Sequence, residues 1–197
     1  MTMALRHGFK SEANKVAADL RAELSLDHLA PFEPRVAAKY LDIPVISFDQ
    51  IKGCDEALGI LRNAGRAVSG LTIFEGSRRM IIYNDYHSPG RVNNTIAHEI
   101  AHALLMHSPG PALGTHGCRR VNRDLEDEAD YLAGVLLLPD AACLHCARLL
   151  LTVDEISMRY AVSPQLASYR LNITGARPRA AASVASASKQ HRWAKGA

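Results

Sequence analysis

The chain lacks any long hydrophobic run. Its purely apolar stretch Val135–Leu138 covers only four residues, whereas a helix that spans a bilayer needs about 20. No charged start precedes an apolar segment near the amino terminus, so we expect no signal peptide and no membrane segment. Aromatic residues are also sparse at 6%, but a hydrophobic content of 48% is enough for a folded core.

Cysteine is scarce, and one end of the chain has no acidic residue. The four cysteines come without a secretion signal, which favours free thiols and a cytoplasmic location. The net charge is +3, but no acid follows Gly175, so the part before it is slightly negative and has no general nucleic-acid signature. The basic residues of this tail are Arg177, Arg179, Lys189, Arg192 and Lys195.

The sequence does contain the pattern His98-Glu99-Ile100-Ala101-His102. On a helix, positions i and i+4 lie one turn apart on the same face, so both imidazoles can reach one metal ion. The glutamate beside them can hold a water molecule, and this combination is typical of zinc hydrolases. The pattern predicts a Zn²⁺ site in which His98 and His102 are ligands and Glu99 is the general base.

The flanking residues predict that the motif lies on a capped amphipathic helix, Thr95–His107. Asn93, Asn94 and Thr95 are the N-cap candidates. Apolar residues of helical period form a stripe along the segment, and a stretch rich in Pro and Gly, 108–111, ends it. The motif is therefore expected on a rigid element.

A second predicted helix supplies candidates for a third ligand, because catalytic Zn²⁺ usually has three protein ligands and one open position. Four carboxylates within residues 126–130 precede an apolar run that we expect to be buried. Glu126 and Asp130 share a face, so one can bind the metal while the other accepts the Nδ1–H of a ligand histidine. Asp127 and Glu128 lie on other faces and are expected to be solvated. Alternatively, all four acids only favour the start of a helix.

Before the motif, the sequence alternates between short helices and short strands. Pro34 suits the first turn of a helix whose inward residues are Val36, Ala37, Tyr40 and Leu41. Pro44 indicates an edge strand, and a turn at 75–78 joins two strands into a hairpin. The predicted elements are helices at 11–24, from Pro34 and at 55–63, strands at 43–46, 70–74 and 80–83, and a polar loop at 84–91.

A pair of cysteines, Cys143 and Cys146, has two interpretations. With His145 between them they suggest a metal or redox role. Their spacing also suits one face of a helix, and packing as small hydrophobic side chains is the interpretation we favour.

The segments 153–160 and 165–171 predict a helix–turn–helix unit. Ser163 is its N-cap candidate, followed by Pro164 at the first helical position. Arg159 and Arg170 are near enough in sequence to suggest DNA contact. Two helices joined by a tight turn pack against a core more often than they enter a groove, so direct DNA binding is not the interpretation we favour.

Together these motifs resemble the ImmA/IrrE family of bacterial and phage zinc metallopeptidases. The chain is similar to that family in the histidine motif, in the block Glu126-Asp127-Glu128-Ala129-Asp130 and in the apolar run that ends at Pro139. The likeness extends over roughly residues 10–172. It implies an α+β, zincin-like fold that is mostly helical, with a small mixed or antiparallel sheet and a C-terminal helix–turn–helix-like appendage.

The resemblance also implies roles and partners. Glu126 would be the third Zn²⁺ ligand and Asp130 the hydrogen-bond partner of a ligand histidine. The substrate would be a helix–turn–helix repressor or antitoxin, whose cleavage derepresses stress, mobile-element or toxin–antitoxin genes. We expect a peptidase domain at 1–140, a helical appendage packed on it at 141–174, and a disordered basic tail at 175–197.

Two mechanistic hypotheses follow. In a peptidase, Glu99 takes a proton from water and returns it to the leaving amine, and strand Met80–Tyr83 is an edge that pairs with an extended substrate. In a regulator without turnover, the zinc is structural or absent, and the C-terminal helices bind DNA or a repressor. Glu99 argues against the second, because a structural site has no use for a base. The candidates for oxyanion support are Tyr86, His87, His107 and His116, although a surface or cap role is preferred for each.

Overall fold

The structure is a computed structural model that describes residues 5–53, 68–76, 78–107 and 122–183. Helices dominate this part of the chain and accompany a three-stranded mixed sheet, so the predicted α+β class is confirmed. The helix predicted at 55–63 lies outside the described residues.

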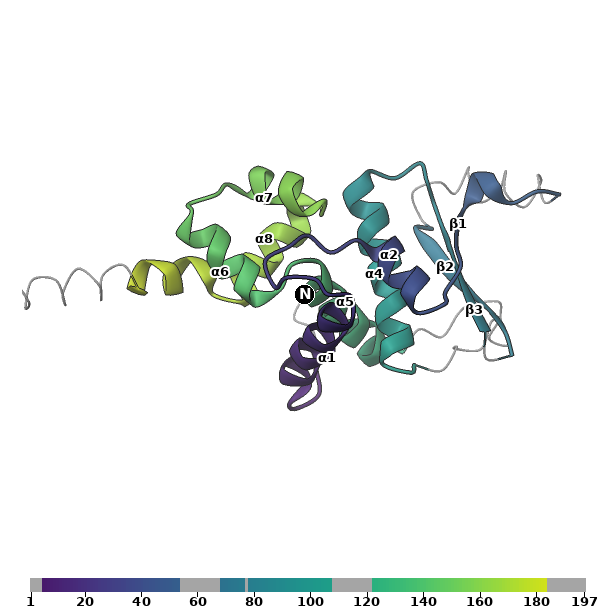
Figure 1. Ribbon diagram of the computed structural model, residues 1–197, viewed down its shortest axis with the longest axis horizontal. Helices are drawn as coiled ribbons and strands as arrows, with labels where there is room; N and C mark the ends of the chain where they lie inside the picture. The colour runs from purple at the N-terminus through teal and green to yellow at the C-terminus, as the bar shows by residue number, and fades with distance from the viewer. Residues whose placement is uncertain (1–4, 54–67, 77, 108–121, 184–197) are drawn as a thin grey trace, which may run out of the picture.

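The described elements form three groups along the long axis of Figure 1. They are α1 (Phe9–Glu23), α2 (Pro34–Tyr40), β1 (Val45–Ser47), the 3₁₀ turn η1 (Phe48–Gln50), β2 (Gly70–Glu75), β3 (Arg78–Tyr83), α4 (Pro89–Leu104), α5 (Arg123–Leu137), α6 (Asp140–Arg148), α7 (Val153–Tyr160) and α8 (Pro164–Ile173). The sheet lies at one end, α4 and α5 occupy the middle, and α6–α8 lie at the other end. α1 packs on α5, and α2 packs on α4.

The sheet has the strand order β1-β3-β2, with β1 parallel and β2 antiparallel to β3. The predicted hairpin and the edge position of β1 are confirmed. The prediction that Met80–Tyr83 is an edge strand is wrong, because β3 is paired on both sides and the edges of this sheet belong to β1 and β2. The sequence identifies the strands but carries no signal for their order.

Side chains alternate between the two faces of β3. Ile81 is buried in the main core, which also contains Ile96 and Ile100 of α4, whereas Ile82 belongs to a small second cluster with Phe48. α4 therefore lies on the Ile81 face of the sheet.

α5 is the central buried helix. Every residue from Tyr131 to Leu137 is buried, as the apolar run predicts. The helix is packed against α1, α4 and α8. Taken alone, none of the helices among the described residues is long and apolar enough to cross a membrane, and α5 and α6 meet that test by length and composition only as a pair bent by 51°.

α2 and α4 differ from their predictions in detail. Val36 and Tyr40 are 54% and 52% exposed, so they do not point inward. Ala37 is buried as predicted, Leu41 is partly buried against the core, and Ala38 is buried as well. α4 has its N-cap at Ser88 and not within 93–95. The helix starts earlier than predicted because it begins with Pro89, whose missing N–H would have no partner at the first helical position.

α4 ends in a Schellman turn that contains no glycine. Met106 has a left-handed φ of +52°, and its N–H donates to the Ala103 carbonyl at 3.1 Å. The N–H of His107 donates to the His102 carbonyl at 3.0 Å. The sequence predicts that the helix continues to His107, but α4 ends at Leu104. The sequence does not signal this end, because the left-handed residue of the turn is a methionine and not a glycine. The turn folds His107 back toward His102.

The helix–turn–helix unit forms as predicted, and it packs on the core. The Ser163 side chain accepts a hydrogen bond from the Leu166 N–H at 3.1 Å, which confirms the cap. Arg170 is fully buried; its Nε donates to the Leu138 carbonyl at 3.0 Å and its Nη2 to Asp140 Oδ1 at 2.6 Å. Arg170 therefore ties α8 to the junction of α5 and α6 and is not available for DNA contact.

The start of the tail is ordered, in contrast to the prediction of disorder from residue 175. Residues 176–183 are helical, and Ala176 and Ala180 are buried in the main core. Alanine has the highest helix propensity, and two alanines one turn apart present a small face that can pack closely. Residues 184–197 lie outside the described residues.

The two cysteines of α6 pack as small hydrophobic side chains. Cys143 and Cys146 are both fully buried and free. Burial raises the pKa of the Cys143 thiol to about 11, so it stays protonated near neutral pH. This supports the packing interpretation over a metal or redox role.

Gly90 allows α4 to touch the turn between α7 and α8. A Cβ at this position would lie 2.6 Å from the Val162 carbonyl carbon and 2.8 Å from the Ser163 nitrogen. Both are backbone atoms and cannot move aside cheaply. Nearby, Asn93 Nδ2 donates to the Ala161 carbonyl at 3.1 Å, so α4 is anchored to this turn at two points.

Replacing Gly90 by alanine tests this contact, because the change in the free energy of unfolding should have opposite signs with and without the clash. Helix propensity alone would make Gly90→Ala more stable by up to about 1 kcal/mol. The clash predicts the opposite, a loss of about 1–3 kcal/mol in the free energy of unfolding. Urea unfolding followed by circular dichroism measures the difference. A variant as stable as the wild type, or more stable, would refute the close approach.

Candidate metal centre

Three side chains from α4 and α5 converge on one point. His98 and His102 lie one turn apart on α4, and Glu126 lies in the first turn of α5. A metal-ligating atom of each is within 4.8 Å of the others. The sequence prediction that these three residues come together is thus met by the geometry.

The spacing of the three donor atoms fits a tetrahedral zinc ion. Ligand atoms that lie about 2.0–2.1 Å from such an ion are about 3.3 Å from one another. Here His98 Nε2 lies 3.0 Å from His102 Nε2 and 3.2 Å from Glu126 Oε2, and His102 Nε2 lies 3.6 Å from Glu126 Oε2. The group can therefore hold Zn²⁺ without a large rearrangement.

The acidic start of α5 is positioned by its cap and by its buried half. The Asn122 side chain accepts from the Asp124 N–H at 3.2 Å, which fixes where the helix begins. One turn after Glu126, Asp130 Oδ1 lies 2.8 Å from His98 Nδ1. The sequence left open which of Glu126 and Asp130 faces the metal. The structure places Glu126 at the Nε2 side and Asp130 behind the ring.

One acid of this block is not where the sequence predicts. Glu128 is buried, with 7% of its surface exposed, and is not solvated. Its Oε2 lies 3.5 Å from His107 Nε2, and its Oε1 lies 2.8 Å from Arg6 Nε. Burial of a carboxylate is tolerated because these groups surround it.

The charges in the site shift each other's pKa. Burial lowers the pKa of His98, but hydrogen bonds to Asp130 and Glu126 raise it more, to about 10. The imidazoles of His102 and His98 hold the pKa of the Glu126 carboxyl well below its usual range. A proton and a metal ion therefore compete for the same nitrogen of His98.

Glu99 is held by the edge strand β2. Thr72 pairs with Ile81 across the sheet, so its side chain lies on the face that packs against α4. The Thr72 hydroxyl donates to Glu99 Oε2 at 2.5 Å. Nothing in the sequence marks Thr72, because one threonine in a strand gives no functional signal.

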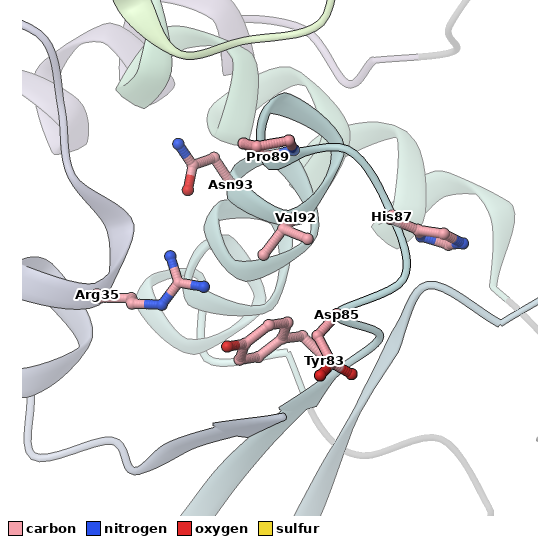
Figure 2. A pocket seen from close by; sticks show the side chains of 7 residues that line it. All are labelled: Arg35, Tyr83, Asp85, His87, Pro89, Val92 and Asn93. Atoms are coloured by element: carbon pink, nitrogen blue, oxygen red, sulfur yellow. The ribbon is translucent and has the colours of Figure 1, made fainter. Parts of the chain in front are cut away.

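The four candidates for oxyanion support lie in different places. Tyr86 is 63% exposed and donates to Asp49, and His116 lies outside the described residues. His87 lines a pocket of about 220 Å³ that shares no residue with the three donors, and Figure 2 shows its ring turned away from Arg35 and Val92. The structure supports neither Tyr86 nor His87 as oxyanion support, and it does not test His116.

The fourth candidate, His107, lies on the outer side of His102. Its Nδ1 is 2.9 Å from His102 Nδ1, the nitrogen that points away from Glu126. The pKa of His107 is lowered, mainly by burial and to a lesser extent by the charge of the nearby His102. Oxyanion support is therefore the wrong role for His107 in this structure.

Removing the carboxylate of Asp130 tests the electrostatics of the site without a metal. In metal-free protein, Asp130→Asn should lower the pKa of His98 from about 10, because the neutral amide no longer stabilises the imidazolium. Histidine titration followed by NMR measures this. Asp124→Asn, at the exposed start of the same helix, is the matched control. An unchanged pKa in Asp130→Asn would show that this pair does not set the charge of His98.

A family model and a solved structure are similar to this chain. No curated protein matches the chain. A solved structure, a transcriptional regulator of Mycobacterium tuberculosis, is 15% identical with a TM-score of 0.49; the match covers 84% of this chain and 47% of that one, so this chain spans about half of its length. A family model of the peptidase M78 group, described as the IrrE N-terminal-like domain, matches residues 39–172, more than half of the chain and the whole of both site helices. The predicted ImmA/IrrE resemblance is confirmed, and the chain belongs to the IrrE N-terminal-like family.

Proposed function

We propose that this chain is a zinc-dependent endopeptidase that acts in gene regulation. Membership of the peptidase M78 family supports a metallopeptidase-type regulator. The observation that carries the proposal of peptide cleavage is the carboxylate of Glu99 beside the three-ligand group. A purely structural metal site would not need this carboxylate.

The residues divide into ligands, a base and groups that orient them. His98, His102 and Glu126 would hold the ion, with Asp130 fixing the ring of His98. A bound Zn²⁺ supplies Lewis acidity, which acidifies water and polarises the scissile carbonyl. Glu99 accepts the proton from water and delivers it to the leaving amine, and Thr72 holds Glu99 in place for both transfers.

β2 is the strand that we propose for binding substrate. It is an edge of the sheet, and it carries Thr72, whose hydroxyl contacts Glu99. An extended peptide that pairs with β2 would therefore run past the base. This replaces the proposal for Met80–Tyr83, which lies in the centre of the sheet.

The proposed substrate is a helix–turn–helix repressor or antitoxin. This follows from the family resemblance, and the family match over residues 39–172 supports it at the level of a regulatory metallopeptidase. A repressor encoded beside the gene for this chain is the first substrate to assay.

Substitution of the base separates catalysis from metal binding. Glu99→Gln should retain zinc, measured by elemental analysis, because Glu99 is not among the three ligands. Cleavage of the co-expressed repressor should fall by about 10²–10⁴-fold, because the proton acceptor is lost. If Glu99→Gln preserved the biological output, the chain would act as a non-catalytic regulator instead.

Zinc binding should release protons. Because the pKa of His98 is about 10, this residue carries a proton at pH 7.5 that Zn²⁺ must displace. The affinity for zinc should therefore rise with pH and level off above about pH 10. Calorimetry in buffers of different ionisation enthalpy should show release of about one proton. Proton-independent binding at pH 7.5 would contradict this charge state.

A further inference from the structure

Both histidines of the motif have a partner at Nδ1, but the two partners come from different places. His98 is held by Asp130, which belongs to the next helix. His102 is held by His107, which follows on the same segment of chain. His107 has no part in the metal binding or the proton transfer proposed for this site.

The end of α4 determines the position of His107. In the Schellman turn around Met106, the His107 N–H already donates to the carbonyl of His102 at 3.0 Å. The same turn sets the two rings edge to face, with centroids 5.0 Å apart and an angle of 66° between the planes. Backbone and side chain of His107 thus both contact His102, which limits the freedom of its ring.

The outer side of His107 is also fixed. The side chains of His107 and Glu128 are only 8% and 9% exposed, and they lie 3.5 Å apart between Nε2 and Oε2. Glu128 in turn accepts from Arg6 Nε at 2.8 Å, and Arg6 Nη2 donates to Glu12 at 2.7 Å. A chain of polar contacts therefore runs from a proposed metal ligand to the first helix.

The donor and acceptor roles follow from the ligand position of His102. If Nε2 of His102 binds a metal, the proton of the neutral ring is on Nδ1, which donates to His107. Nδ1 of His107 must then be the acceptor, and its proton is on Nε2, facing the Glu128 carboxylate. Every donor along the contacts from His102 through His107 to Glu128 thus faces an acceptor.

We propose that His107 is a positioning residue that orients the His102 ring for metal binding, and that Glu128, paired with Arg6, fixes the orientation and tautomer of His107. The inference rests on the proposed function, because it assigns a role toward the same metal. It adds a second layer to the site, which the motif His98–His102 does not contain.

Two substitutions at one position separate the hydrogen bond from the volume. His107→Leu removes the acceptor, whereas His107→Asn retains an oxygen near the place of Nδ1. We expect the leucine variant to bind zinc about 10–100-fold more weakly, measured by chelator competition, and the asparagine variant to recover most of this loss. His28→Leu, on the exposed loop after α1, is the matched control and should bind as the wild type does.

Cobalt substitution gives a readout that does not depend on activity. If the ring of His102 is misplaced, the visible d–d spectrum of the Co²⁺-loaded leucine variant should differ from that of the wild type, and the asparagine variant should restore it. Wild-type zinc affinity and an unchanged cobalt spectrum in His107→Leu would overturn the role of His107 and leave the proposed function standing. A wild-type protein that binds neither metal would overturn both.

NMR of the zinc-bound wild type tests the tautomers without any variant. Long-range ¹⁵N–¹H spectra should show His102 protonated at Nδ1 and His107 protonated at Nε2. This measurement remains decisive if His107→Leu does not fold. A proton on Nδ1 of His107 in the zinc-bound protein would overturn the inference.

Discussion

The register between α4 and α5 is the constraint on which the site depends. One helix contributes two imidazoles a turn apart, and the other contributes two carboxylates a turn apart, so the pairs match only in one alignment. Rotation of α5 by one residue, about 100°, would turn Glu126 and Asp130 away together. The buried run Tyr131–Leu137 prevents this, because rotating it would expose an apolar face. Core packing thus fixes the geometry of polar groups at the rim.

Three elements around the motif each contact a different side chain of it. α5 supplies the carboxylates behind and beside His98, the edge strand β2 holds Glu99 through Thr72, and the turn after α4 returns His107 to His102. Asp130 comes from a helix buried in the core, Thr72 from a strand paired with β3, and His107 from the hydrogen-bonded turn that ends α4. Groups held in this way lose little freedom when a ligand arrives, which favours tight and well-directed binding.

The sequence predicts the parts of the site that depend on helical spacing. His98 and His102 follow from i, i+4 periodicity, and Glu126 and Asp130 follow as a pair, although periodicity alone cannot say which of the two faces the metal. Only the family resemblance selects Glu126 as the ligand, and its place at Nε2 depends on how two helices cross. The hairpin and the C-terminal helices likewise follow from local patterns, whereas the α+β class follows from the family resemblance.

What the sequence could not show depends on tertiary contacts and on turns without glycine. Strand order, the contact of Thr72 with Glu99 and the burial of Glu128 have no local signature. The sequence misplaces the end of α4 because Met106 adopts a left-handed conformation that usually marks glycine, and this same turn brings His107 to His102. The sequence gives no signal for the helix at 176–183, because this helix depends on packing against the core.

X-ray absorption at the zinc edge measures the ligands of the bound ion. We expect one zinc per chain, bound by two imidazole nitrogens at about 2.0–2.1 Å and one carboxylate oxygen at about 2.0–2.2 Å, with no sulfur neighbour. Failure of the purified chain to retain zinc, or a sulfur ligand at about 2.3 Å, would contradict it.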